Sequence, residues 1–129
     1  MNRDATQYSP RVRDLFARLP GADQLAAGAG AIFSGEAIAL DRGAWVRFEA
    51  RVDGARIADC VFRAWGCPHT LAASAWVASK LRGREVESCS EIDALQMARE
   101  LEAPAEKMGR LLIVEDALRA LLREAGAVQ

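Results

Sequence analysis

The sequence predicts an α+β fold in which a three-stranded antiparallel sheet has helices packed on one face. Two observations lead to this fold class. Residues 44 to 52 alternate apolar and polar side chains, which is typical of a strand with one buried face. After residue 67 the apolar residues recur instead at the spacing of amphipathic helices. Strands that precede helices along the chain favour a sheet whose helices are gathered on one side.

Length and composition limit the possible classes of protein. The 129 residues suit one domain, residues 1–129, with a moderate core. Acidic and basic side chains nearly balance at a formal charge of −1, so neither nucleic acid nor an anionic membrane is an expected partner. No apolar run is long enough to cross a bilayer, and the first residues lack the pattern of a signal peptide. Three irregularly spaced cysteines make no disulfide framework, and we expect a reducing, cytoplasmic location.

Three strands are expected in sequence, joined by short links. The first runs from Ala31 to Leu40 with an interruption at Gly35, and Asp41-Arg42-Gly43 makes the turn into the second. Asp53-Gly54 is a hairpin signal, after which residues 56–65 return as the third strand. Short links of this kind favour an antiparallel meander. The side chains expected to face the core are Val46, Phe48, Ala50 and Val52 on the second strand, and Ala58, Cys60, Phe62 and Ala64 on the third.

Four helices are expected around this sheet. Ser9-Pro10 opens one before the strands, and Leu19-Pro20-Gly21 ends it. Pro68 to Leu81 forms the helix that follows the third strand. Ser90-Glu91-Ile92-Asp93 resembles a capping box for a short helix that ends near Leu101, and Pro104 marks the start of the last helix. The apolar stripe of that last helix comprises Leu111, Val114, Leu118, Leu121, Leu122 and Ala125.

Cys67 is the strongest candidate for a functional residue. It stands where the third strand gives way to a helix, with Gly66 permitting a tight turn and Pro68 suited to the first helical position. A thiol at a helix N-terminus is favoured as the thiolate, which is the form that binds metal, carries a persulfide or attacks as a nucleophile. Of the other cysteines, Cys60 is expected to be buried in the core and Cys89 to be an incidental surface thiol.

The order of these elements and the residues at their joints resemble the iron–sulfur cluster scaffold family of IscU and the NifU N-terminal domain. The resemblance runs from Tyr8-Ser9 through residues 62–67 (Phe-Arg-Ala-Trp-Gly-Cys) to Glu115-Asp116-Ala117. It implies a three-stranded antiparallel sheet with helices on one side. Typical members build a nascent cluster on three cysteines, assisted by an aspartate and often a histidine, since soft thiolates suit iron clusters and zinc.

When the family's ligand positions are matched to this sequence one by one, as the resemblance implies, only one of the three cluster cysteines is present. Cys67 matches the middle one. The position of the first cysteine holds Arg42, and that of the aspartate holds Ala44. The positions of a His-Cys pair hold Gly109-Arg110. If the loops adopt the family geometry, the two arginines would lie near Cys67, lower its pKa further and repel iron. The segment that recruits an Hsp70-type chaperone corresponds to Ala103-Pro104-Ala105-Glu106-Lys107, which has lost its apolar character, and this makes such recruitment doubtful.

A metal site at Cys67 would need further ligands. His69 is the only histidine, and Asp41 from the neighbouring loop would supply the third group of a Cys67, His69 and Asp41 site for iron, a cluster or zinc. The more common outcome is a histidine with a capping or surface role.

Three functions follow from these residues. The first is a scaffold-like protein of iron–sulfur cluster assembly that binds iron, a cluster or a persulfide through Cys67, with a homodimer as one possible assembly. The second is an adaptor or regulator of the cysteine desulfurase pathway that holds no cluster. The third, an enzyme with Cys67 as nucleophile and His69 as base, ranks last because residues two apart at a helix start do not face each other. We therefore expect a non-enzymatic protein with a cysteine desulfurase as its partner.

Overall fold

The computed structural model describes residues 9, 10, 25 and 27–126. The helix expected between Ser9 and Leu19 lies outside the described residues. None of the described helices is long and apolar enough to cross a membrane.

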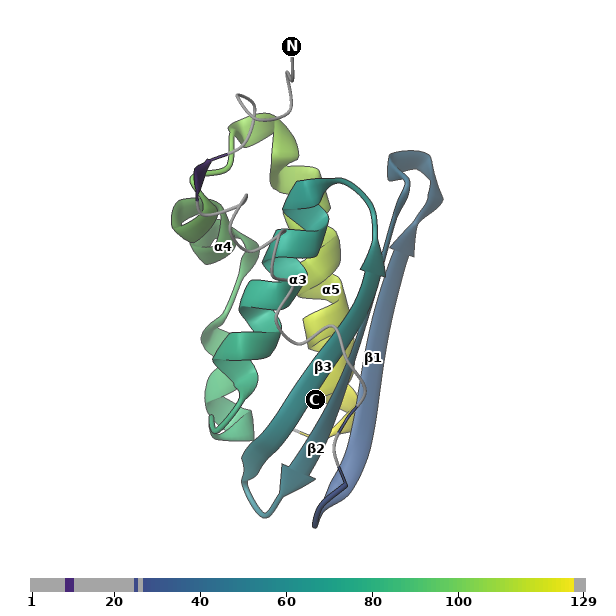
Figure 1. Ribbon diagram of the computed structural model, residues 1–129, viewed down its shortest axis with the longest axis vertical. Coiled ribbons are helices and arrows are strands. Elements are labelled where there is room, and N and C mark those ends of the chain that lie inside the picture. Colours follow the sequence, from purple (N-terminus) through teal and green to yellow (C-terminus); the bar gives the residue numbers. More distant parts are fainter. Residues whose placement is uncertain (1–8, 11–24, 26, 127–129) are drawn as a thin grey trace.

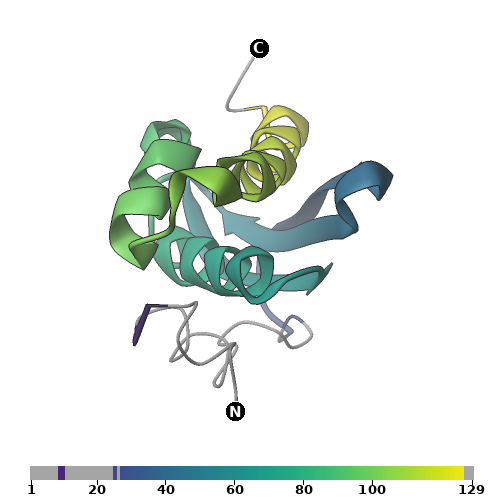
Figure 2. The ribbon, with the colours of Figure 1, turned by 90° about the horizontal axis from the view of Figure 1, so that it is seen from above.

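The fold is a three-stranded antiparallel sheet with helices on one face, as the sequence predicts. The strands β1 (Ala31–Ala39), β2 (Ala44–Asp53) and β3 (Arg56–Trp65) lie side by side in the order β1-β2-β3. Helix α3 (Pro68–Leu81) packs on β3, and α5 (Met108–Glu124) packs on β1 and β2. Both views place these two helices on the same face of the sheet (Figure 1, Figure 2).

A shorter helix and three 3₁₀ turns complete the described chain. Helix α4 (Ala94–Leu101) packs on α3 and α5. The 3₁₀ turn η1 (Leu40–Arg42) joins β1 to β2, η2 (Val86–Glu91) follows α3, and η3 (Ala105–Lys107) leads into α5. The turn η2 follows the end of α3, and η3 precedes the start of α5. The turns η1 and η3 lie near the site described below.

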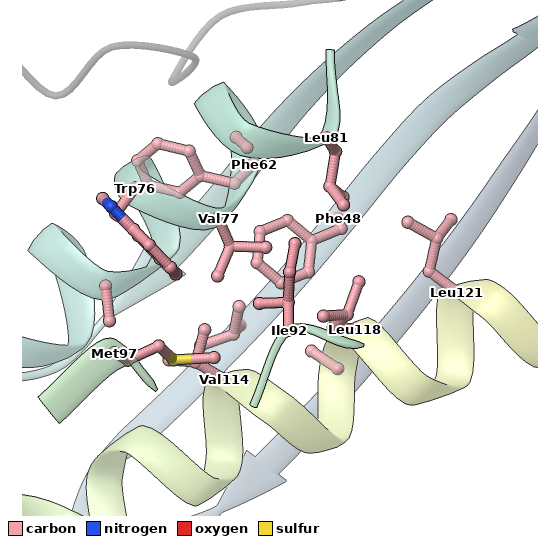
Figure 3. Packing of buried hydrophobic residues seen from close by; sticks show 14 of the residues in the cluster. Phe48, Phe62, Trp76, Val77, Leu81, Ile92, Met97, Val114, Leu118 and Leu121 are labelled. Carbon is pink, nitrogen blue, oxygen red and sulfur yellow. The ribbon is translucent and has the colours of Figure 1, made fainter. Parts of the chain in front are cut away.

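The core lies between the sheet and the helices (Figure 3). Phe48 of β2 is fully buried and lies among side chains from α3 and α5. Trp76 and Leu81 of α3 and Leu118 of α5 are buried in the same cluster. The apolar stripe expected on the last helix faces this core, with Ala125 only partly buried at its end. Hydrophobic burial thus holds the helices to one side of the sheet.

A β-bulge changes which residues of β3 face the core. Arg51 pairs with Asp59 and Val52 pairs with Ile57, so Ala58 is an extra residue in β3. Beyond the bulge the alternation is reversed, and Ile57 is buried while Ala58 is exposed. The prediction that Ala58 faces the core is therefore wrong. Cys60 and Phe62, on the other side of the bulge, are buried as predicted.

Gly35 lies where β1 passes closest to α5. A Cβ atom at this position would lie 2.1 Å from the backbone nitrogen of Leu121 and 2.7 Å from the carbonyl oxygen of Ala117. The strand continues through Gly35 without a break. The glycine expected to interrupt the strand is instead a residue that lets the helix backbone approach the sheet.

The start of α4 differs from the capping box that the sequence suggests. Ser90 lies in η2, and Asp93 is the N-cap, whose carboxylate accepts a hydrogen bond from the Gln96 N–H at 2.8 Å. A second carboxylate, from Glu115 of α5, accepts the Ala94 N–H at 2.6 Å. Arg119, one turn further along α5, donates to the carbonyl oxygens of Ser90 and Ile92. Side chains of α5 therefore fix the segment that leads into α4.

Replacing Glu115 with alanine is expected to lower the free energy of unfolding by about 1 to 2 kcal/mol, since it leaves an N-terminal N–H of α4 without its acceptor. Urea unfolding measures the change. Asp116→Ala is the control, because Asp116 is an exposed acid on the same helix that makes no hydrogen bond with α4, and its replacement gains at least as much helix propensity. Equal effects of the two substitutions would contradict a capping role for Glu115.

Candidate functional site

Three segments lie at one end of the long axis of the molecule: the η1 turn between β1 and β2, the junction of β3 with α3, and the start of α5 (Figure 1). The sheet register brings the first two to the same end, since Ala39 pairs with Ala44, and Trp45 pairs with Trp65. The start of α5 reaches the η1 turn through Gly109, whose backbone lies against the guanidinium of Arg42. Cys67 stands at this end of the fold.

The sequence around Cys67 folds as a helix start, as predicted. Cys67 is the N-cap of α3 in an extended conformation, and Pro68 occupies the first helical position. Gly66 has φ +151°, a conformation that favours glycine, and a Cβ there would make a tight contact, 3.1 Å, with the Thr70 side chain. The turn holds the thiol, which is half-buried, beside the first residues of α3.

The Cys67 thiol is strongly acidified. Partial burial by itself raises its pKa, but hydrogen bonds from the side chains and backbone N–H groups of His69 and Thr70 outweigh burial and lower the pKa from 9.0 to about 6. The Cys67 sulfur lies 3.7 Å from the Thr70 hydroxyl oxygen. No regular capping hydrogen bond forms, so several longer contacts share this effect. Cys67 is therefore mostly thiolate at neutral pH.

Thr70 and His69, which lower the pKa of Cys67, have roles that the sequence interpretation did not predict. Thr70 was not among the candidate residues, although it occupies the third helical position, where a residue commonly approaches the N-cap side chain. His69 is fully buried and hydrogen-bonds to the thiol, because Cys67 precedes the helix and its side chain turns back over the first turn. No arginine contributes to the lower pKa.

The other two cysteines are fully buried, and their pKa values are raised. Cys60 is fully buried in the core as predicted, and burial, opposed by Arg82, raises its pKa to about 12. Cys89 is also fully buried, so the expectation of a surface thiol is wrong. Its polar neighbours in sequence belong to η2, which folds against α5 and turns Cys89 inward. Burial, opposed by Arg84, raises the pKa of Cys89 to about 11. Only Cys67 is both accessible and acidified.

Apart from Cys67, the positions that the resemblance matches to family ligands hold residues that cannot bind iron. Arg42 lies in the exposed η1 turn, Ala44 is buried, and Arg110 stands in the first turn of α5 beside Gly109. Asp41 is exposed in η1. In the part of the chain that the structure describes, no three His, Cys, Asp or Glu side chains gather closely enough to hold a metal ion, so Cys67, His69 and Asp41 form no such group.

This donor set does not fit a cluster held by one chain, because a single thiolate supplies too few ligands. It does fit chemistry that needs one reactive sulfur. The fold and the site thus define a small α+β protein that presents one activated thiolate at the start of a helix.

Comparison with known proteins identifies the family. The family model described as the NifU-like N-terminal domain matches residues 7–124, and the chain belongs to this family. It is 34% identical over 68 residues to the iron–sulfur cluster assembly scaffold protein IscU of Rickettsia prowazekii, covering 53% of this chain and 52% of that protein. It is 31% identical over 77 residues to the protein of the same name from Haemophilus influenzae, covering 60% and 61%. The chain therefore spans about half to three-fifths of the length of these curated relatives.

Solved structures share the fold. A protein described as a scaffold for iron–sulfur cluster assembly in the SUF system of Fervidobacterium islandicum AW-1 superposes with a TM-score of 0.70 at 16% identity, covering 91% of this chain and 97% of that one. The N-terminal part of a NifU-like protein from Brucella abortus gives a TM-score of 0.56 at 16% identity, covering 98% and 88%. At these identities the comparison shows the fold alone.

Proposed function

We propose that this protein works in iron–sulfur cluster assembly as an acceptor of sulfur, which it carries as a persulfide on Cys67. The observation that supports this role is the single accessible thiolate at the start of α3, with a pKa of about 6. A cysteine desulfurase is the expected partner, since such an enzyme presents sulfur as a persulfide on its own cysteine. Membership of a family whose named relatives are cluster assembly scaffolds supports a role in this pathway.

The proposed transfer is a thiol–persulfide exchange. The Cys67 thiolate attacks the outer sulfur of the partner's persulfide, forming a new S–S bond on Cys67. The partner's S–S bond breaks, and its electron pair leaves with the partner's cysteine as a thiolate. The proton on the outer sulfur moves with that sulfur, so no outside oxidant or reductant is needed. The hydrogen bonds from His69 and Thr70 hold the attacking sulfur as thiolate before the transfer.

The alternative is a scaffold that holds a cluster between two copies of the chain, each supplying one Cys67. The names of the relatives favour it. The donor set opposes it, because arginine has no free lone pair at neutral pH and Arg42 and Arg110 occupy positions where ligands would be needed. An adaptor that only regulates the desulfurase is the remaining alternative, and it needs no sulfur on Cys67. Recruitment of an Hsp70-type chaperone through residues 103–107 is not part of this proposal.

The proposal predicts that Cys67→Ser abolishes sulfur loading. The protein is incubated anaerobically with a cysteine desulfurase, cysteine and ferrous iron, and is then analysed by intact mass, absorption spectrum, and iron and sulfide content. We expect the wild type to gain the mass of one sulfur atom on Cys67 without stoichiometric iron. Cys89→Ser is the matched control, because it makes the same chemical change at a thiol that is buried.

Two other outcomes of the loading experiment would each favour a different function. Equal amounts of iron and sulfide with cluster absorption bands, lost in Cys67→Ser, would replace the proposal with the two-copy scaffold. Wild type that takes up neither sulfur nor iron, while it changes the rate of the desulfurase, would replace it with the adaptor.

A further inference from the structure

A basic and apolar surface lies at the same end of the fold as Cys67 but is built from other residues. Arg42 of η1 and the first turn of α5 meet at Gly109, where an added Cβ would lie 2.4 Å from the Arg42 Nη1 atom. We call this the Arg42–Arg110 surface and define it by Leu40, Arg42, Lys107, Arg110 and Leu112.

The three cations of the Arg42–Arg110 surface have no partner within the described chain. No ion pair or side-chain hydrogen bond joins Arg42, Lys107 or Arg110 to another described residue. Most of the other described arginines, by contrast, bind carboxylates or carbonyl groups, as Arg82 does with Asp59 and Arg119 with Glu115. Two nearby acids, Asp41 and Glu106, leave one positive charge in excess. The guanidinium and ammonium groups are thus available to a ligand with carboxylates.

A hollow gives this surface its shape. It is lined by Pro104, Glu106, Lys107 and Arg110, has a volume of about 590 Å³ and is open to solvent. This volume is much larger than the roughly 30 Å³ share of one water molecule, so a simple inorganic anion would leave most of the hollow empty. A peptide side chain with part of its backbone would fill it, with the Glu106 carboxylate available to accept an N–H of that backbone.

Apolar side chains flank the cations. Leu40 in η1 is 78% exposed, and Leu112, one turn after Gly109 on the same side of α5, is 46% exposed. Exposed apolar area beside unpaired arginines suits a protein partner better than a free anion, because arginine is enriched in protein interfaces and a free anion gains nothing from the leucines. They favour a partner that carries apolar residues between its acids.

We infer that the Arg42–Arg110 surface binds an acidic segment of a partner protein, in which carboxylates contact Arg42, Lys107 and Arg110 and apolar side chains contact Leu40 and Leu112. The inference goes beyond the proposed sulfur transfer, since none of these residues bears on the Cys67 thiol. It assigns a binding role to residues at two family ligand positions, Arg42 and Arg110, that have no metal-binding chemistry.

Fluorescence anisotropy tests this inference with a labelled peptide that alternates glutamate and leucine. We expect the peptide to bind the wild type, and Arg42→Glu and Arg110→Glu each to weaken binding by about fivefold or more, with a further loss as salt is raised. Arg123→Glu is the matched control, because it makes the same charge change about 20 Å along α5, at 1.5 Å rise per residue, and should change the affinity by less than about twofold. Thermal unfolding confirms that each variant is folded.

Two further peptides test whether acidic and apolar side chains both contribute to binding, and one further variant tests whether Cys67 takes part. A lysine–leucine peptide and a glutamate–serine peptide should bind more weakly than the glutamate–leucine peptide. Cys67→Ser should bind the peptide like the wild type, so that this inference and the proposed function fail independently. The inference is overturned if the charge reversals leave the affinity unchanged, if the basic peptide binds as well, or if inorganic phosphate alone displaces the peptide at comparable affinity, which would indicate a site for small anions.

Discussion

Gly35→Ala is expected to lower the free energy of unfolding by about 3 kcal/mol. The added methyl group would lie 2.1 Å from the Leu121 backbone nitrogen and 2.7 Å from the Ala117 carbonyl oxygen. Both atoms belong to the backbone of α5, so neither can rotate away. The helix must move off the sheet instead, which loosens the contact of α5 with β1. Urea unfolding of the purified variant measures the effect.

Gly109→Ala is the control for this substitution. Its Cβ would also lie close to another atom, 2.4 Å from the Arg42 Nη1, but that atom ends a flexible side chain that can turn into solvent. The helix gains up to about 1 kcal/mol from the alanine, so the variant should be as stable as the wild type or slightly more stable. A Gly35→Ala protein as stable as the Gly109→Ala protein would show that β1 and α5 are less closely packed than described.

Cys67 should react with iodoacetamide at a rate that is half-maximal near pH 6, while Cys60 and Cys89 remain unmodified in the folded protein. At pH 7 a thiol with this pKa is roughly 90% thiolate, against about 1% for a thiol that titrates at 9. Thr70→Val keeps the volume of this buried side chain and removes its hydroxyl, so the midpoint should move upward. Mass spectrometry of digests quantifies each cysteine separately.

The same pKa requires a particular dependence of stability on pH. Because the pKa of Cys67 is lower in the folded protein than the ordinary value of 9.0, ionisation of Cys67 stabilises the fold above pH 9. This stabilisation is lost as the pH falls from 9 to about 6. The difference in unfolding free energy between wild type and Cys67→Ser should follow this course, and a difference that is constant over this range would contradict an acidified thiol.

The sheet and the main helices could be predicted from the sequence because their signals are local. Alternation along β2, the Asp53-Gly54 turn and the Pro68 helix start each depend on neighbouring residues. The extra residue Ala58 could not be found this way, because a bulge is defined by pairing with the opposite strand. Burial of Cys89 likewise depends on α5, which packs against η2 and begins 19 residues after Cys89 in the chain.

The candidate site was predicted in position but not in detail. Glycine, cysteine and proline in succession locate the helix start, and the structure places Cys67 there as the N-cap. The contacts that acidify the thiol come from side chains whose directions only the folded turn determines, those of His69 and Thr70. The contact between Arg42 and Gly109 joins residues 67 positions apart, and no short sequence pattern records it.

That contact constrains how positions 42 and 109 can vary among related chains. An arginine can rest on the bare backbone of α5 in this way only while the residue beneath it lacks a side chain. Chains with a larger residue at position 109 should therefore have a smaller residue at position 42, or an arginine there that points away from α5. Within the family, an arginine at 42 should therefore lie against α5 only in chains that have glycine at 109.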